Sequence, residues 1–195
     1  MKILAFVDLH GNIKKLRDLK KKAKQADIIV CAGDLSIFGT EQDTIMAELD
    51  SIGKKVLLIH GNHESEEETK ALCAIFDNLK FIHKKVYTFK DYCFIGWGGG
   101  GFSLVDTAFE KFANKIKEKI KGKKVVLVTH APPYNTKVDY IYKQHAGNKS
   151  IRKFIETTKP KIDICGHLHE TANKKDKIKN TLVINPGPDG AIITI

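Results

Sequence analysis

The first apolar run of the chain reads Lys2-Ile3-Leu4-Ala5-Phe6-Val7-Asp8-Leu9-His10-Gly11. Five consecutive apolar residues, Ile3 to Val7, predict a strand that is buried on both faces. Asp8 and His10 follow directly, and side chains two residues apart in an extended chain point to the same face. We therefore expect both side chains to converge at the carboxyl end of this strand.

The same arrangement recurs after four later apolar runs, which predict strands at about 27–32, 56–60, 125–129 and 162–165. The residues that follow them are Gly33-Asp34, Gly61-Asn62-His63-Glu64, His130 and Gly166-His167-Leu168-His169. Five of the eight histidines thus lie at predicted strand ends, in segments that contain a glycine or the strand-terminal Thr129. In open α/β sheets such ends line the functional site, so these residues are candidates for one common centre.

Amphipathic stretches alternate with the strands. Ile13, Leu16, Leu19 and Ala23 share one helical face, and Asn12 is a suitable N-cap for that helix. Further helices are expected at about 41–52, 64–76, 104–121 and 149–158, and further strands at 81–82, 86–89, 92–97, 181–185 and 191–194. The pattern predicts an α/β fold in which two sheets pack face to face with helices outside.

Composition limits the class of protein. The chain has 195 residues, of which 42% are hydrophobic, and no linker or internal repeat divides it, so we expect one domain over 1–195. No apolar run approaches the roughly 18 residues that span a bilayer. Asp8 comes too early for the apolar region of a signal peptide, which favours a cytoplasmic location. The four scattered cysteines are interpreted as reduced core thiols.

The formal net charge of +10 comes almost entirely from lysine. Lysines gather at 20–24, at 115–124 and at 174–179. Such runs either bind a polyanion or form the solvated faces of helices and a loop. Aromatic residues that could stack on bases are missing from all three runs, so nucleic acid is a possible but not a favoured partner. The charge favours anionic substrates in general.

Seven of the strand-end residues are candidate metal ligands. They supply carboxylate, amide and imidazole groups and no thiolate, a set that suits Mn²⁺, Fe, Zn²⁺, Ni²⁺ or Co²⁺. Seven ligands are too many for one tetrahedral ion, but they fit two ions about 3.5–4 Å apart that share a bridge.

In order and spacing these motifs resemble the calcineurin-like metallophosphoesterase superfamily, and the likeness spans nearly the whole chain. His130-Ala131-Pro132-Pro133-Tyr134 and Asn185-Pro186-Gly187-Pro188 further resemble the small predicted phosphoesterases common in archaea. The resemblance implies a four-layer α/β/β/α sandwich of two mixed sheets flanked by helices. By position, Asp8, His10 and His169 would hold one metal, and Asn62, His130 and His167 the other. Asp34 would bridge both, and His63 would be the acid that assists the leaving group.

Several branches of the superfamily fit less well. Protein phosphatases of the calcineurin type continue the Gly-Asp motif with Asp-Arg-Gly, where this chain has Leu35-Ser36-Ile37-Phe38. Purple acid phosphatases carry a tyrosine at the position of Ile37. The repair nucleases have added segments for which this chain has no room. The retromer scaffold subunit has lost catalysis, whereas here every ligand position and His63 are present.

The resulting hypothesis is phosphoester hydrolysis by a hydroxide bound between two divalent metal ions, with manganese favoured and His63 as the acid. Because no arginine lies in the ligand motifs to clamp a monoester dianion, a phosphodiester of small-molecule or nucleotide type is favoured. The alternatives are a nuclease that acts on longer nucleic acid and a non-catalytic scaffold stabilised by metal. Asn12 is a further candidate for substrate binding, and oligomeric state is left open.

Overall fold

The first apolar run forms β1 (Lys2–Phe6), which pairs with a strand on either side. The computed structural model describes residues 1–195. The first sheet has the order β13 (Ala191–Thr194), β1, β2 (Ile28–Cys31), β3 (Val56–Leu58) and β4 (Leu79–Phe81). β1 to β4 run parallel and only β13 is antiparallel, so four strands end at the same edge of this sheet.

The second sheet is also mixed. Its order is β11 (Lys175–Ile178), β12 (Thr181–Ile184), β10 (Ile162–Ile164), β7 (Lys124–Thr129), β6 (Tyr92–Trp97) and β5 (Lys85–Phe89). The four inner strands are parallel and the two edge strands are antiparallel. A separate short hairpin joins β8 (Tyr140–Ile141) to β9 (Gln144–His145).

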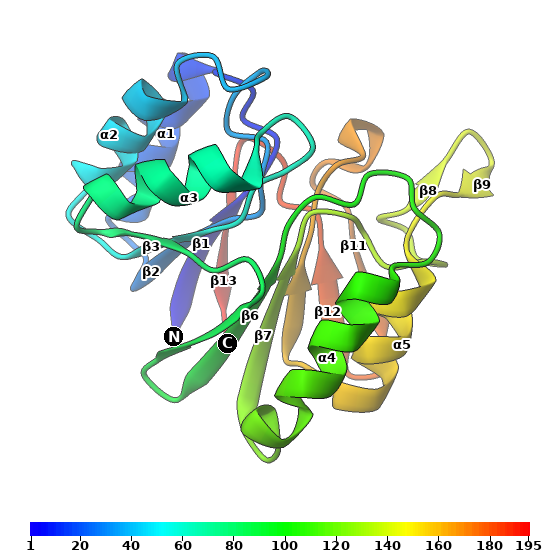
Figure 1. Ribbon diagram of the computed structural model, residues 1–195. Coiled ribbons are helices and arrows are strands. Elements are labelled where there is room, and N and C mark those ends of the chain that lie inside the picture. Colours follow the sequence, from blue (N-terminus) through cyan, green and yellow to red (C-terminus); the bar gives the residue numbers. More distant parts are fainter.

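Helices cover the outer face of each sheet (Figure 1). Beside the first sheet lie α1 (Ile13–Ala23), α2 (Gln42–Asp50) and α3 (Glu66–Ile75), and beside the second lie α4 (Thr107–Ile120) and α5 (Lys149–Thr158). The helix starts follow side-chain caps: Asn12 accepts from the Lys15 N–H, Asp106 from that of Phe109 and Asn148 from that of Ile151. Asp106 therefore starts α4 three residues later than the helical periodicity predicts.

Three apolar cores hold four layers together. Alternate residues of β1 and its continuation point opposite ways: Leu4 and Phe6 pack toward the helices, while Ile3, Ala5 and Val7 pack toward the second sheet. A core of 18 residues lies under α1 to α3, one of 16 lies between the sheets, and one of 15 lies under α4 and α5. The predicted α/β/β/α sandwich is confirmed.

Some local expectations are wrong. The lysine-rich run at 174–179, expected as a loop, contains β11, whose lysines border the sheet; charged side chains on an edge strand discourage pairing with another chain. The strand expected at 81–82 lies two residues earlier as β4, and the hairpin β8–β9 was not predicted. The four cysteines are free and buried, as predicted. None of the helices is long and apolar enough to cross a membrane.

Candidate metal centre

All eight predicted centre residues lie in loops that follow parallel strands. Those after β1, β2 and β3 come from the first sheet, and those after β7 and β10 come from the second. Because the carboxyl ends of these strands face the same edge of the sandwich, residues up to 159 positions apart become neighbours. The side chains gathered there are Asp8, His10, Asp34, Asn62, His63, His130, His167 and His169.

Asp34 lies between two groups of candidate ligands. Its Oδ2 is 3.8 Å from His10 Nε2 and 3.5 Å from His130 Nε2. Its other oxygen, Oδ1, accepts the backbone N–H of His63 at 3.0 Å, which fixes the orientation of the carboxylate. One oxygen of Asp34 thus faces both groups at once, which is the position that a bridging ligand requires.

The first group contains Asp8, His10 and His169. Their ligand atoms lie within 4.8 Å of one another, and the Nε2 atoms of His10 and His169 are 2.9 Å apart. Burial raises the pKa of Asp8 to about 6, although the charge of His130 opposes this shift. A carboxylate that is destabilised by burial gains from a nearby cation, so this group favours a positive charge between its members.

The second group contains Asn62, His130 and His167. The Asn62 Oδ1 lies 3.0 Å from His130 Nε2 and 2.8 Å from His167 Nδ1. His130 Nδ1 lies 2.9 Å from the carbonyl oxygen of Ala32, which can only accept a proton, so Nδ1 carries the hydrogen. His130 Nε2 then faces two oxygens, those of Asn62 and Asp34. Either a proton on Nε2 or a bound cation would satisfy them. Burial opposes a charged His130, but the hydrogen bond and charge of Asp34 outweigh this effect and raise the pKa of His130.

The ionisation states at this centre suit metal binding. Burial alone would raise the pKa of Asp34, but the hydrogen bond and charge of His130 outweigh it and lower the pKa to about 2. Burial and the charge of His130 lower the pKa of His167 to about 4. At neutral pH the centre therefore offers an ionised carboxylate and a neutral imidazole, the forms that bind metal.

The backbone at the centre is strained. Asp8, His10, Asp34 and His167 have positive φ values of 55°, 46°, 53° and 69°. The prediction that Asp8 and His10 converge through extended geometry is therefore wrong: β1 ends at Phe6, and a left-handed loop brings them together. Left-handed backbone costs about 1–2 kcal/mol per non-glycine residue, and such strain gathers at functional sites.

Gly61 allows the loops to approach. A Cβ atom at this position would lie 1.8 Å from Asp34 Oδ1, a distance that no side chain tolerates. The glycine before Asn62 thus lets the loop after β3 pass directly against the bridging carboxylate.

Glu64 makes contacts around the centre that the sequence did not reveal. The sequence predicts a helix that begins at about Glu64, but Ser65 caps α3 and Glu64 is buried before it. Its carboxylate accepts the backbone N–H groups of Asp34, Ser36 and Gly61 at 3.0, 2.9 and 2.9 Å. Glu64 therefore ties the loop after β2 to the loop after β3 and holds both in place at the centre.

His63 and Asn12 lie at different points around the centre. The His63 ring is 4.8 Å from the His10 ring, and its buried Nδ1 has no hydrogen-bond partner. Asn12 Oδ1 accepts the Lys15 N–H at 3.0 Å, so the predicted N-cap of α1 is confirmed. A contact between Asn12 and substrate stays a prediction.

A second histidine cluster lies beside this centre, and no sequence signal predicted it. His60 and His83 form an edge-on ring pair at 4.5 Å, and Glu66 Oε2 is 3.3 Å from His83 Nε2. The backbone N–H of Gly98 donates to His83 Nδ1 at 2.7 Å, and the Gly99 N–H donates to the His60 carbonyl at 3.1 Å. This cluster, His60–Glu66–His83, anchors the glycine-rich loop at 98–101.

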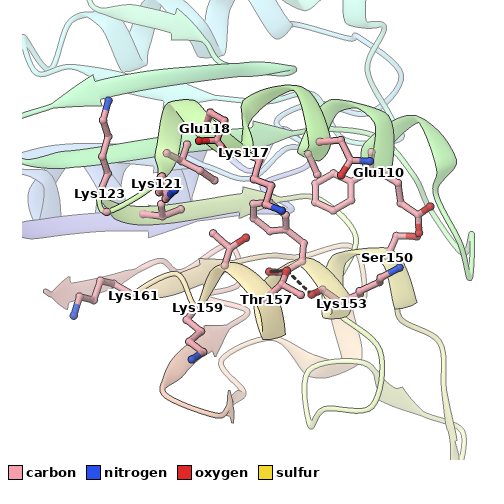
Figure 2. A pocket seen from close by; sticks show the side chains of 18 of the residues that line it. Glu110, Lys117, Glu118, Lys121, Lys123, Ser150, Lys153, Thr157, Lys159 and Lys161 are labelled. Atoms are coloured by element: carbon pink, nitrogen blue, oxygen red, sulfur yellow. Dashed lines mark hydrogen bonds between the residues drawn. The ribbon is translucent and has the colours of Figure 1, made fainter.

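A cavity of about 890 Å³ lies elsewhere, between α4 and α5 (Figure 2). It contains none of the candidate ligands. Its lining includes two glutamates, Glu110 and Glu118, and seven lysines that form no ion pair: Lys117, Lys121, Lys123, Lys124, Lys153, Lys159 and Lys161. The cavity is a basic surface separate from the metal centre.

The fold and the clustered Asp, Asn and His side chains define a class of protein. Residues 1–171 match the calcineurin-like phosphoesterase family, and the chain belongs to this family. It is 37% identical to the uncharacterized protein MJ1162 of Methanocaldococcus jannaschii, over 96% of this chain and 88% of that protein.

Two solved structures share the fold. TT1561 of Thermus thermophilus has a TM-score of 0.79 at 16% identity, covering 96% of this chain and 90% of that one. A dimetal phosphatase from Danio rerio has a TM-score of 0.63 at 14% identity, covering 94% and 86%.

Proposed function

We propose that this chain is a metal-dependent phosphodiesterase whose centre holds two divalent cations, manganese in preference to iron, zinc, nickel or cobalt. The observation that carries the proposal is the placement of Asp34 Oδ2 between His10 Nε2 and His130 Nε2. Asp8, His10 and His169 would hold one ion, and Asn62, His130 and His167 the other. Because both sheets supply ligands, the proposal includes one domain over residues 1–195.

Bound divalent cations would neutralise phosphoryl oxygens and lower the pKa of a water molecule that attacks phosphorus. The chain's own residues position these groups. Asp34 is oriented by the His63 N–H, and Glu64 holds the peptide groups on both sides of the centre. Ligand groups held in this way need little rearrangement during the reaction, and such preorganisation favours catalysis.

His63 would deliver the proton to the leaving oxygen. Its ring stands at the edge of the centre beside His10, and its Nδ1 is free of any hydrogen bond within the chain. The backbone N–H of His63 donates to Asp34 Oδ1, so the distance between the proposed acid and the proposed bridging ligand is fixed. A positioned acid of this kind contributes roughly 10²–10⁴-fold to the rate.

A diester is favoured over a monoester because no guanidinium reaches the centre. Arg152 donates instead to Glu156 and to the carbonyl groups of Tyr134 and Asn135. Arg17 lies on α1 outside the ligand loops. A monoester dianion would lack the bidentate clamp that arginine provides, whereas a diester carries one negative charge.

Hydrolysis of bis(p-nitrophenyl) phosphate with added Mn²⁺ tests this function. We expect turnover by the wild type and a loss of roughly 10² or more in His63→Ala, with two metal ions per chain kept in both proteins. Equal rates in the two proteins would remove His63 from the reaction. Bound metal without turnover of diesters or monoesters under any of the five metals would favour the scaffold alternative.

The lysine-lined cavity favours a second candidate substrate, a longer nucleic acid. Figure 2 shows Lys117, Lys121 and Lys153 beside the cavity between α4 and α5, where a phosphate backbone could bind. Neutralising several phosphates makes binding fall steeply with salt. Nuclease action is supported if KM for an oligonucleotide rises steeply between roughly 50 and 200 mM salt. The double variant Lys117→Ala, Lys121→Ala should then flatten that rise. A KM that does not change with salt in the wild type excludes nuclease action.

A further inference from the structure

Phe38 stands at the tip of a strained turn beside the centre. The turn runs from Ile37 to Thr40, whose N–H donates to the Ile37 carbonyl at 3.0 Å. Phe38 and Gly39 both have positive φ, 50° and 79°. Two consecutive left-handed residues are usual for asparagine and glycine, and a phenylalanine there is a genuine outlier.

The ring of Phe38 is not used to build the core. It is 79% exposed, yet it lies 4.6 Å from the His63 ring at an interplanar angle of 36°. Phe102 repeats the pattern: it is 67% exposed and lies 4.6 Å from the His167 ring. Of the ten phenylalanines, only these two are exposed, and each contacts a different histidine of the centre.

The strained turn is firmly held. The Gly39 N–H donates to Ser36 Oγ at 3.2 Å, and the Ser36 N–H donates to Glu64 Oε1 at 2.9 Å. The same carboxylate that fixes Asp34 therefore also fixes the base of the turn that carries Phe38. Backbone strain persists only where the surroundings impose it, and here they impose it on an exposed aromatic side chain.

We propose that Phe38 and Phe102 form two subsites that bind planar aromatic groups, such as phenyl rings or nucleobases, on either ester arm of a phosphodiester. This inference rests on the proposed function. Phe38 packs on the proposed acid His63, so it would contact the leaving group, and Phe102 packs on His167, so it would contact the group that stays on phosphorus. An aromatic pair contributes about 0.5–1.5 kcal/mol beyond burial, which corresponds to roughly two- to tenfold in affinity.

Two diesters of equal charge test the subsites. Binding of diphenyl phosphate and dimethyl phosphate to the manganese-loaded protein is measured by calorimetry. We expect diphenyl phosphate to bind at least about tenfold more tightly to the wild type. Phe38→Ala and Phe102→Ala should each lower the ratio of the two affinities roughly five-fold. Because dimethyl phosphate carries no aromatic group, its affinity should stay unchanged. Ile75→Ala, an exposed apolar position on α3, is the matched control.

The outcomes separate the subsites from the reaction. Equal affinity for the two diesters in the wild type, or a preference that survives both substitutions, would overturn the subsites and leave the diesterase proposal intact. Failure of both diesters to bind would overturn the proposed function and the subsites with it. Phe38→Trp provides a gain-of-function check, because a larger planar ring should keep or increase the preference for diphenyl phosphate.

Discussion

Two histidine clusters lie side by side in this molecule, and they differ in the groups that face the nitrogen atoms of their rings. In the metal centre, His130 Nδ1 faces the Ala32 carbonyl, and its Nε2 faces oxygens of both Asn62 and Asp34. In the His60–Glu66–His83 cluster, the Gly98 N–H already donates to His83 Nδ1. The proton of His83 is then on Nε2, which faces Glu66.

The backbone shows the same contrast. Four candidate ligands of the metal centre have positive φ, and none of the three members of the second cluster does. Lys84 Nζ further lies 2.7 Å from Glu66 Oε2 and supplies the cation that this carboxylate needs. Counting histidines and carboxylates therefore does not identify a metal site: both clusters bring such groups within 4.8 Å, but only in the second is the carboxylate already paired with a lysine.

The largest expected effect comes from removing the shared ligand. Asp34→Asn should lower diester hydrolysis by at least roughly 10³-fold, since the bridging position of the proposed centre would lose its negative charge, a loss of several kcal/mol. Steady-state rates with saturating Mn²⁺ check this. His83→Gln is the matched change in the other cluster, and it should lower the rate far less than Asp34→Asn. Similar losses in the two variants would mean that the clusters act as one.

Glu64→Gln should weaken metal binding roughly 10- to 100-fold, because the amide cannot accept three N–H groups as the carboxylate does. We also expect a loss of about 2–3 kcal/mol in unfolding free energy from the donors left unpaired. Metal titrations and urea unfolding measure the two effects. Unchanged metal affinity would show that the loops after β2 and β3 hold their positions without this carboxylate.

The His60–Glu66–His83 cluster should make the unfolding free energy depend on pH in the acid range. Burial and the charge of His60 lower the pKa of His83 to about 3, against the opposing effect of Glu66 and in addition to that of Lys84. The unfolded chain takes up a proton below about 6.5, so this residue's contribution is complete above 6.5 and is lost as the pH falls toward 3.

Glutamine at position 83 can keep both hydrogen bonds without titrating. Between about pH 6.5 and 4, His83→Gln should therefore lose on the order of 2 kcal/mol less stability than the wild type. Urea unfolding at a series of pH values gives the comparison. Parallel curves for the two proteins would show that His83 titrates normally in the folded state.

The smallest expected effect concerns strain near the metal centre. Phe38→Gly should raise the unfolding free energy by about 1 kcal/mol relative to Phe38→Ala, because glycine adopts positive φ without cost. Thermal unfolding of the two variants measures the difference. If alanine is as stable as glycine at this position, the turn carries no strain and the argument for a functional Phe38 weakens.

The sequence predicted the layers of the fold well because buried strands and amphipathic helices leave strong periodic signals. Asp8, His10 and His130 were predictable because they directly follow such strands. Glu64 and His83 were not, since their partners are backbone N–H groups that only the folded loops bring near. The exposed phenylalanines left no signal either, because exposure of Phe38 depends on a turn whose backbone the pattern does not specify.

Metal content per chain tests the central claim most directly. The wild type, His83→Gln and Asp34→Asn are dialysed to equilibrium against Mn²⁺, and bound metal is measured by mass spectrometry. We expect two ions in the wild type, two in His83→Gln and fewer than one in Asp34→Asn. A third ion that disappears with His83→Gln, or two ions retained by Asp34→Asn, would contradict the distinction between the two clusters.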